Sequence, residues 1–385
     1  MKILYLATQP ELRLGAKTGY GTHMREMIRA FEQLGHEVRP LIAGDAFAQD
    51  EASAPASGPS RLKKWVPALL WQSLRDLRRF RSDRLLRPLL EAEIERFNPD
   101  VIYERGSYGS ALGVRTARAF GIRHALEWNA PFVEERVTLS GRSALLFYAR
   151  CLATEAKSTT DLAVVVSEGL ARTSRITSLS PRYLVTHNAI RHDFTPPPRQ
   201  WDRRDFGWDG THTVIGFVGS IFPWHGVDRL IAALPAAVAA HPEVRCLIVG
   251  DGEVRPDLEA QAAALGLTDI VHFTGSVPHA AAIDAIRLMD VCTLPSSHSY
   301  GSPIKVFEYA LWGRPIVVHG TEPVAEVMAH RTHGYLCAPA DFEAALLDVL
   351  AHPEEARSWG AAWKARVMAE HTWRRNAERV VDQLA

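Results

Sequence analysis

The chain has 385 residues, more than one ordinary domain holds, which predicts two or three domains. Apolar residues make up 47% and charged residues 23%, and 44 basic side chains balance 44 acidic ones, which excludes disorder, collagen-like repeats and a globally cationic nucleic-acid binder. Apolar runs are too short for a membrane-spanning helix, and four widely spaced cysteines without a C-x-x-C pair indicate a reducing, cytoplasmic setting.

Apolar runs that suit buried strands alternate with helical patterns through the first half of the chain. A strand over 3–7 precedes a glycine-containing loop and a helix over about 22–34, which Gly35 closes. Further strands are expected over 37–42, 101–104, 124–128, 163–166 and 183–186. The stretch 45–59, rich in Ala, Ser, Pro and Gly, is expected to be a loose loop. This alternation predicts βαβ units around a parallel sheet.

The zero net charge hides a strongly basic segment in the first half. Nine basic and two acidic residues lie between Arg61 and Arg87, with apolar side chains at the helical spacing 66, 70, 74 and 77. A basic amphipathic helix over 61–87 suits an anionic membrane surface, on which the protein would be peripheral. The alternative is an ordinary helix packed on the first sheet. A nucleic-acid role is disfavoured, because no reading motif accompanies the charge.

The second half begins after three consecutive prolines at 196–198, which can continue neither a helix nor a central strand and so predict a linker. Strands are expected over 213–218, 244–249, 270–274, 291–294 and 315–319, with helices such as 227–240 and 280–289 between them. The chain is therefore expected to form two doubly wound α/β halves. Ligands of such sheets bind beyond the carboxyl ends of the strands, so the loops after the strands are candidate sites.

Three loops of the second half follow an expected strand and precede a helix, over 219–226, 250–253 and 295–305. Gly219, Gly250 and Gly252 would let the backbone approach a ligand closely. The helix after each loop would direct free N–H groups at the same place, which suits an anion. Glycine after a strand is common in α/β proteins, so one such loop is weak evidence.

The third of these loops carries more specific chemistry. Ser302 suits a helix N-cap and Pro303 the first helical position, which predicts a helix from there to Gly313. Lys305 and Glu308 share a face of that helix. A phosphate at the helix start would meet free N–H groups and the ammonium, and Glu308 would accept hydrogen bonds from ribose hydroxyls. The alternative is a solvated Lys–Glu pair, which the apolar neighbours disfavour.

Polar residues also stand beside expected strand ends and helix starts. Glu127, Asn129 and Arg105 follow or end strands of the first half and are candidates for orienting an acceptor hydroxyl or a sugar. His23 and His225 are candidates for donor contact, because each lies beside the start of a helix that follows a glycine-containing loop. Plain strand-end capping and structural histidines are the alternatives. His, Asp and Glu are not grouped at the spacing of metal ligands, so no metal is expected.

The ordered motifs of both halves resemble the retaining GT-B glycosyltransferases of the GT4 type, glycosyltransferase group 1. The motifs are GFVGSIFPWHGVDRLIAAL, LIVGDGE and SPIKVFEYALWGRPIVV in the second half and TGYGTH, GHEV, LEWNAP, VVVSEGLA and VTHNAI in the first. The resemblance implies the GT-B fold, with two Rossmann-like domains facing a cleft. It implies an acceptor-binding domain over 1–195, a nucleotide-sugar domain over 196–368, and a helix in 369–385 that returns to the first domain.

The resemblance also implies where a nucleotide-diphosphate sugar would be held. The implied donor-binding residues, in loops after strands or near helix starts, are Gly19, His23, Gly219, Ser220, Gly250, Gly252, Ser302, Pro303, Ile304, Lys305 and Glu308. The candidate catalytic residues are Lys305, Glu308, His225, Asn129 and Glu127, and the candidate acceptor-binding residues are Arg105 and Asn129.

Three departures from the family's pattern bear on the substrate. Tyr300 stands eight positions before Glu308, where the family often has the first carboxylate of Glu-x7-Glu. Ser220 and His225 stand where many members carry Arg and Lys, and Asn129 where a histidine often follows the strand. These changes leave the diphosphate charge to Lys305, helix ends and His225, and they put the identity of the sugar in doubt.

The implied activity is that of a hexosyltransferase (EC 2.4) that retains the anomeric configuration. The donor would be a UDP- or GDP-sugar and the acceptor a glycan, a lipid-linked molecule or a small molecule, with no cofactor and no metal. Front-face substitution is favoured, because no convincing carboxylate pair suits a covalent route. The alternatives are a GT-B-like nucleotide-sugar epimerase and a catalytically degenerate nucleotide-sugar-binding subunit. The base, sugar, acceptor and oligomeric state are left open.

Overall fold

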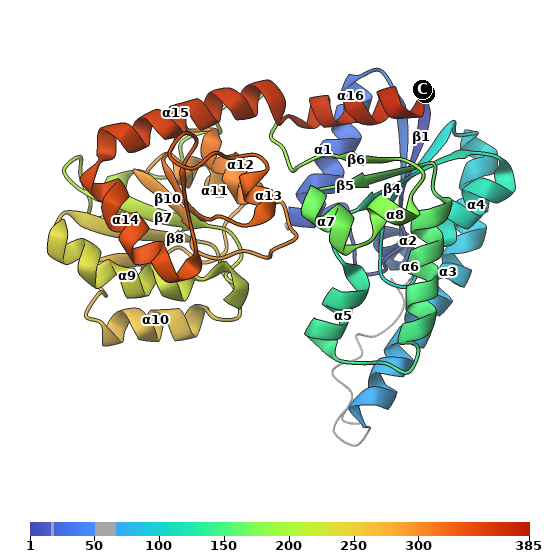
Figure 1. Cartoon of the computed structure of the whole chain (residues 1–385), viewed down its shortest axis with the longest axis horizontal. Coiled ribbons are helices and arrows are strands. Elements are labelled where there is room, and N and C mark those ends of the chain that lie inside the picture. Colours follow the sequence, from blue (N-terminus) through green and yellow to red (C-terminus); the bar gives the residue numbers. More distant parts are fainter. Residues whose placement is uncertain (17–18, 51–66) are drawn as a thin grey trace. The chain divides into compact units, whose positions relative to one another are not determined.

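The structure is a computed structural model that describes residues 1–16, 19–50 and 67–385 (Figure 1). The chain divides into two compact units, unit 1 with Met1–His187 and Trp373–Ala385, and unit 2 with Asn188–Thr372. The first division falls earlier than the expected 195/196 boundary and the second later than 368/369. The segment after His187 already contacts unit 2, since Asn188 donates its N–H to Ser302 Oγ and Ile190 donates its N–H to the His371 carbonyl.

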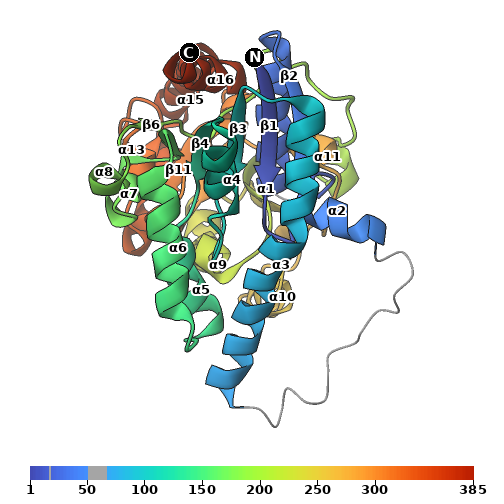
Figure 2. The same cartoon turned by 90° about the vertical axis from the view of Figure 1, so that its right-hand side faces the viewer.

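Unit 1 is built on a six-stranded parallel sheet with the order β2-β1-β3-β4-β5-β6 (Figure 2). Its strands are β1 Lys2–Ala7, β2 Glu37–Ile42, β3 Val101–Arg105, β4 Arg123–Trp128, β5 Leu162–Val165 and β6 Tyr183–Val185. They confirm the predicted strands to within a residue, because the central runs are apolar on both faces and lie buried. The order reverses between β1 and β3, where ligands of such sheets bind at the carboxyl ends.

The helices of unit 1 are α1 Gly19–Gln33, α2 Ala43–Asp50, α3 Ala68–Phe97, α4 Leu112–Phe120, α5 Phe132–Ser140, α6 Leu146–Thr159, α7 Glu168–Thr173, α8 Ile176–Leu179 and α16 Trp373–Leu384. The loose loop expected over 45–59 is wrong for its first residues, which belong to α2. The rest of that stretch, 51–59, lies outside the described residues. The last helix, α16, packs against α1, and the Trp373 ring meets the His23 ring edge-on at 4.7 Å.

The basic segment expected over 61–87 corresponds, from residue 68 on, to the long helix α3, while 61–66 lies outside the described residues. The second half of α3 packs on the sheet through the buried side chains Leu86, Leu90 and Ile94. Its first half does not, because the predicted apolar stripe Leu70, Leu74 and Leu77 is exposed. The packed-helix alternative is therefore confirmed for the second half of α3 only. The membrane-surface prediction concerns the exposed first half, where it stays a prediction.

Unit 2 contains a second six-stranded parallel sheet, with the order β12-β11-β10-β7-β8-β9. Its strands are β7 Thr213–Val218, β8 Val244–Val249, β9 Val271–Phe273, β10 Val291–Leu294, β11 Ile316–His319 and β12 Tyr335–Cys337. Five were predicted. The three-residue strand β12 was not, because it is only half-buried and too short to show a pattern. This order is that of dinucleotide-binding folds and reverses between β7 and β10.

The helices of unit 2 are α9 Val227–Ala240, α10 Arg255–Ala264, α11 His279–Ile286, α12 Ile304–Ala310, α13 Glu322–Ala325, α14 Phe342–Ala351 and α15 Pro353–Glu370. Short 3-10 turns lie at η3 Arg203–Phe206, η4 Pro223–His225 and η5 Pro339–Asp341. The helix predicted over 227–240 is confirmed, and that over 280–289 is shorter at its end.

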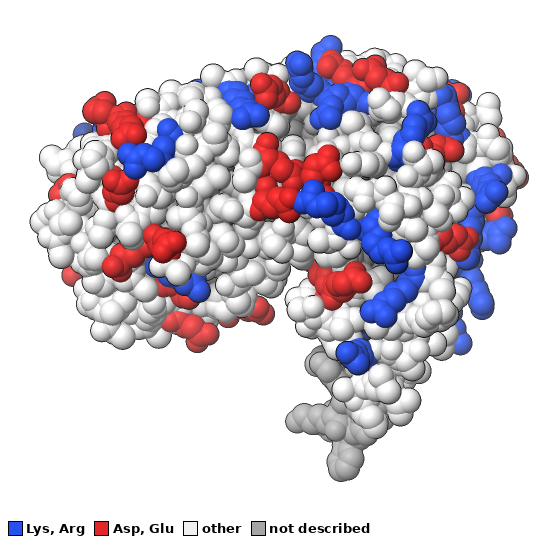
Figure 3. Space-filling model, in the orientation of Figure 1, with Lys and Arg blue, Asp and Glu red and all other residues white. Residues whose placement is uncertain are grey.

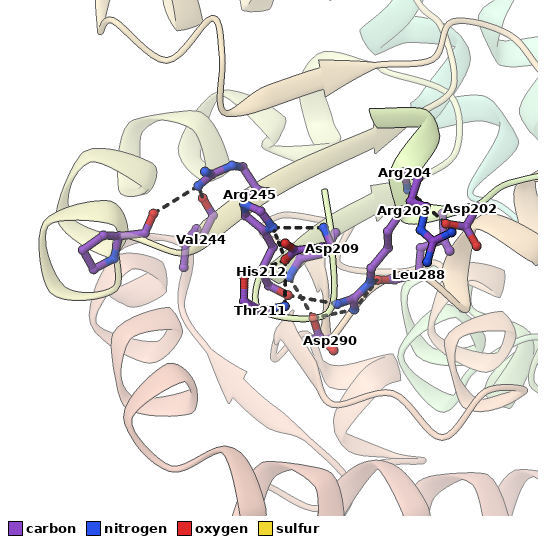
Figure 4. A network of polar contacts seen from close by, with 12 residues as sticks. Asp202, Arg203, Arg204, Asp209, Thr211, His212, Val244, Arg245, Leu288 and Asp290 are labelled. Atoms are coloured by element: carbon purple, nitrogen blue, oxygen red, sulfur yellow. Dashed lines mark hydrogen bonds and ion pairs between the residues drawn. The ribbon is translucent and has the colours of Figure 1, made fainter. Parts of the chain in front are cut away.

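A polar network ties the amino ends of β7 and β10 together (Figure 4). Asp290 accepts hydrogen bonds from Arg203 at 2.7 Å and from the Val214 N–H at 2.8 Å, and Arg203 also donates to the Leu288 and His212 carbonyls. A cavity of about 430 Å³ adjoins this network. It lies at the amino ends of the strands, the edge away from the loops in which such sheets bind ligands, so the network is assigned a structural role.

Candidate functional site

The loops after β7 and β10, over 219–226 and 295–303, meet where the strand order of unit 2 reverses. Ser296 in the second loop donates its N–H to the His225 carbonyl in the first at 3.1 Å. The structure thus gathers most predicted donor-site residues of unit 2 around one point, namely Gly219, Ser220, His225, Ser302, Pro303, Ile304 and Lys305. Open α/β sheets bind their ligands at such a point.

The glycines of this site are required by the packing of the loops themselves. Gly219 and Gly250 have left-handed φ angles of 137° and 131°. A Cβ on Gly219 would lie 2.2 Å from Lys305 Cε, and one on Gly250 would lie 2.1 Å from the Gly219 carbonyl oxygen. A Cβ on Gly252 would lie 2.0 Å from the Ile221 carbonyl oxygen. The sequence predicted that these glycines let a ligand come close to the backbone. In the structure, the atoms close to them belong to Lys305 and to neighbouring backbone.

His225 is held as a neutral imidazole in one tautomer. Its Nδ1 lies 2.7 Å from the Ser220 carbonyl oxygen, which can only accept, so Nδ1 carries the proton. Nε2 is therefore an acceptor, and Lys305 Nζ donates to it across 3.2 Å. Burial and the Lys305 ammonium lower the pKa of His225 to about 3. The expectation that His225 adds positive charge is wrong at neutral pH, because the histidine instead orients Lys305.

Lys305 supplies the positive charge of the site. Burial lowers its pKa from 10.5 to about 8, against the opposite effect of Glu308, so the ammonium is the main form at neutral pH. The ammonium also lies 5.6 Å from the centre of the Phe217 ring. A half-buried ammonium at the carboxyl edge of a sheet suits an anionic ligand.

The helix after the third loop starts later than predicted. α12 begins at Ile304 with Pro303 in the N-cap position, and it ends at Ala310 instead of reaching Gly313. Ser302 does not cap it, because its hydroxyl accepts the Asn188 N–H at 3.0 Å and its carbonyl accepts the Asn188 side-chain amide. Ser302 thus fastens the start of unit 2 to this loop.

Glu308 has a partner that the sequence did not indicate. His279, the first residue of α11, places Nε2 2.8 Å from Glu308 Oε1. His279 is well exposed, whereas Glu308 is mostly buried, so a ligand hydroxyl that hydrogen bonds to Glu308 would compete with an exposed imidazole. The loop after the strand predicted over 270–274 also ends at this edge of the sheet, and that position is the signal that could have pointed to His279.

A row of stacked rings joins the same two loops. Phe222 and Trp224 stack with centroids 4.5 Å apart, Trp224 and His298 lie at 5.0 Å, and His298 and Tyr300 stack at 5.0 Å. Tyr300 is the residue at the place of the first family carboxylate. The structure therefore has a half-buried aromatic surface at the position where the Glu-x7-Glu pattern has its first carboxylate.

Unit 1 gathers the other predicted residues around one buried carboxylate. Glu127, at the end of β4, accepts from Arg105 at 2.7 Å and from the Tyr103 hydroxyl at 2.7 Å. His23 Nε2 lies 3.1 Å from the same carboxylate, and the Asn129 amide also donates to it. Tyr103 was not predicted, because its place inside an apolar strand carries no functional signal.

This cluster fixes the charge of Glu127. Burial alone would raise the pKa of Glu127, but His23, Arg105 and the Tyr103 hydroxyl outweigh it and hold the pKa far below its usual range. Glu127 is therefore an ionised carboxylate with four donors around it. Gly19, predicted to contact a donor, begins α1, and a Cβ there would meet nothing within 4 Å. Its role stays a prediction.

The described part of the chain contains neither a cluster of metal-ligating side chains nor a membrane-spanning helix. Over 1–16, 19–50 and 67–385, no group of three or more His, Cys, Asp or Glu side chains is placed to hold a metal ion. None of the helices in this part of the chain combines the length and apolarity that spanning a bilayer requires.

Sequence relatives of this chain are glycosyltransferases. The D-inositol 3-phosphate glycosyltransferase of Segniliparus rotundus is 30% identical over 192 residues, which cover 48% of this chain and 42% of that protein. The chain spans between about a third and a half of the length of the curated relatives that it matches first.

Solved structures resemble the whole chain. Sucrose-phosphate synthase from Thermosynechococcus elongatus has a TM-score of 0.73 at 16% identity, covering 99% of this chain and 97% of that one. HepE from Anabaena, solved in complex with UDP, has a TM-score of 0.70 at 16% identity and covers 100% and 99%. At such low identity the likeness concerns the fold alone, and it confirms the GT-B α/β fold.

Two family models match the chain, one largely in each unit. The model described as Glycosyl transferase 4-like domain matches residues 18–189, and the one described as Glycosyl transferases group 1 matches residues 212–352. The two models together take in most of the chain, which therefore belongs to the group 1 glycosyl transferases, with a glycosyl transferase 4-like domain in its first half.

Proposed function

We propose that the protein is a retaining glycosyltransferase that moves a hexosyl unit from a UDP- or GDP-sugar to a glycan, a lipid-linked molecule or a small molecule. The observation that carries this proposal is the Lys305 ammonium, which His225 holds over Gly219 where the strand order of unit 2 reverses. A cation held there suits the diphosphate of such a donor. The sequence relative named for inositol phosphate and the UDP complex of HepE support the substrate class.

The proposed chemistry is positioning and charge stabilisation. Lys305 neutralises the diphosphate as the glycosidic bond breaks, and the departing phosphate oxygen takes the proton of the acceptor hydroxyl. Glu308 accepts hydrogen bonds from the ribose, and Gly250 and Gly252 line the nucleoside side. Because Glu127 is already engaged by four donors, it is a poor nucleophile, which favours a front-face route without a covalent intermediate.

The acceptor side is assigned to unit 1. Asn129 Oδ1 is buried and has no hydrogen-bond partner among the described residues, so it is available to a hydroxyl of the acceptor. Arg105 pairs with the Glu127 carboxylate, to which the Asn129 amide also donates. We place the protein in the cytoplasm, where the arginines of α3 favour a peripheral position at an anionic membrane surface.

A panel of UDP- and GDP-sugars incubated with the full chain tests the proposal. Slow release of free UDP or GDP from one donor, accelerated by an acceptor, is the expected result. A donor recovered with an altered sugar would show an epimerase instead. Tight binding without turnover, with acceptors included, would show a degenerate donor-binding subunit, the reading that Tyr300 favours.

Donor affinity is expected to depend on pH through Lys305. Below its pKa of about 8 the ammonium is present and the affinity for UDP or GDP is constant. Above pH 8 the free site loses its charge, so binding must take up a proton and the affinity falls by up to about tenfold per pH unit. Titration calorimetry of the wild type and Lys305→Arg checks this. The arginine variant stays charged and should show a flat profile, and a slope that persists in it would assign the effect elsewhere.

A further inference from the structure

The first turns of α3 leave large apolar side chains in solvent although the rest of the helix is packed. Leu69, Leu70, Leu74 and Leu77 are exposed, with Leu70 at 56%. The helix is held in place further on, because Arg79 donates to the Thr8 and Ser107 hydroxyls at 3.1 and 2.9 Å and pairs with Asp83. The exposed turns therefore belong to an ordered helix with a fixed inner side.

Two other helices add exposed apolar residues at the same end of unit 1. The end of α5 and the start of α6 lie beside the start of α3 in both views (Figures 1 and 2). Leu139 of α5 is 63% exposed and Phe147 of α6 is 79% exposed. We call this set the apolar tip, which comprises Leu69, Leu70, Leu74, Leu77, Leu139 and Phe147.

The apolar tip is a built surface, since contacts fasten the three helices together. Arg136 of α5 donates to Gln72 and Asp76 of α3 at 2.8 and 3.0 Å. Ser73 accepts the Ala144 N–H at 2.9 Å, and the Phe80 ring meets the Tyr148 ring edge-on at 5.0 Å. Asp76, which is buried and paired with Arg136, and these hydrogen bonds hold the exposed leucines of α3 in fixed positions.

The charge around the apolar tip is positive. Residues 68–81 carry four arginines and one aspartate, and residues 132–150 carry three arginines and two glutamates, so both segments are net positive. Arg75, Arg78 and Arg81 are exposed, whereas Asp76 is buried against Arg136. Figure 3 shows Lys and Arg side chains over the lower part of unit 1, with an acidic patch beside them.

We infer that the apolar tip docks unit 1 on an anionic phospholipid surface, with leucine and phenylalanine side chains in the headgroup–acyl boundary and arginines among the phosphates. Clustered exposed apolar side chains mark an interaction surface. A helix with exposed leucines and arginines and few acidic residues suits a membrane interface. The acyl chains attract the leucines, and the anionic headgroups attract the arginines. The inference rests on the peripheral membrane position proposed above, for which it names the surface, and it is independent of the chemistry proposed at Lys305.

Vesicle flotation with the full chain tests the inference. Wild type should bind vesicles of phosphatidylcholine with phosphatidylglycerol, bind much less to phosphatidylcholine alone, and release at high salt. Replacing Arg75, Arg78 and Arg81 by serine should lower partitioning by on the order of 100-fold, roughly fivefold for each arginine. Arg79 is kept, because it pairs inside unit 1.

Matched controls separate docking from general effects. Leu70→Ser with Phe147→Ser should lower partitioning by at least about tenfold. Leu265→Ser with Met368→Ser, at exposed apolar positions of unit 2, should leave it unchanged, and so should serine at Arg96, Arg357 and Arg374. Thermal melting checks that all variants are folded.

Three outcomes would overturn the inference. The first is equal binding of wild type to neutral and anionic vesicles. The second is binding by the apolar tip variants at the wild-type level. The third is no vesicle binding together with self-association in sedimentation that the apolar tip substitutions abolish, which would make the surface an interface between copies. Release of UDP or GDP from the donor panel by the same preparations keeps a failure here distinct from a failure of the proposed activity.

Discussion

Lys305→Ala is expected to lower the rate of glycosyl transfer by about two to three orders of magnitude, the usual cost of removing one group that stabilises a developing oxyanion. Lys305 carries the ammonium at the point where the loops after β7 and β10 meet, and His225 there is neutral. Loss of Lys305 therefore removes this ammonium from the point where the diphosphate would depart. Steady-state kinetics with the donor found in the panel measure the effect.

Two further variants separate the contribution of this loop to donor binding from its contribution to turnover. Glu308→Ala should weaken donor binding with a smaller effect on turnover, because a ribose contact is made equally in the ground and transition states. His225→Asn removes the acceptor on which Lys305 rests and should lower turnover by a smaller factor than Lys305→Ala, since the charge remains. If Lys305→Ala or Glu308→Ala, folded normally, keeps wild-type donor affinity, the assignment of this loop is wrong.

Much of the fold could be predicted because the buried strands of a parallel sheet appear in the sequence as continuous apolar runs. The runs that became β1, β7 and β10 are apolar on both faces, so their limits are visible without knowledge of their neighbours. The surroundings of the first half of α3 could not be predicted in this way. Its apolar stripe has the spacing of a packed face, yet whether that stripe meets a sheet or solvent depends on where Arg79 fastens the helix.

The candidate site could be located from the sequence more easily than its chemistry could be read. Loops that follow strands lie at one edge of a parallel sheet, so Gly219 and Lys305 were expected to lie near each other. The protonation state of His225 was not accessible, because it depends on a contact with the Ser220 carbonyl and on burial. His279 was missed since its partner Glu308 is distant in sequence.

Glu127→Ala is expected to lower the free energy of unfolding by about 3–5 kcal/mol, the cost of leaving a buried charge without its partner. The carboxylate accepts hydrogen bonds from Arg105 and Tyr103 and pairs with His23, and it is 2% exposed. Alanine would strand the Arg105 guanidinium, which is itself mostly buried. Urea denaturation of the two proteins at neutral pH measures the difference. Glu155→Ala, which breaks an exposed pair with Arg115, is the control and should cost less than about 1 kcal/mol.

The same carboxylate should make the protein sensitive to acid. The pKa of Glu127 is 4.5 in the unfolded chain and far lower in the folded state, so unfolding takes up a proton below pH 4.5. Its contribution to stability is complete above that pH and shrinks as the pH falls toward the folded pKa. Glu127→Gln cannot titrate and should lose less stability than wild type between neutral pH and acid. Equal losses in the two proteins, or an alanine variant as stable as wild type, would show that Glu127 is not ionised in the folded chain and that His23 and Arg105 are held by other contacts.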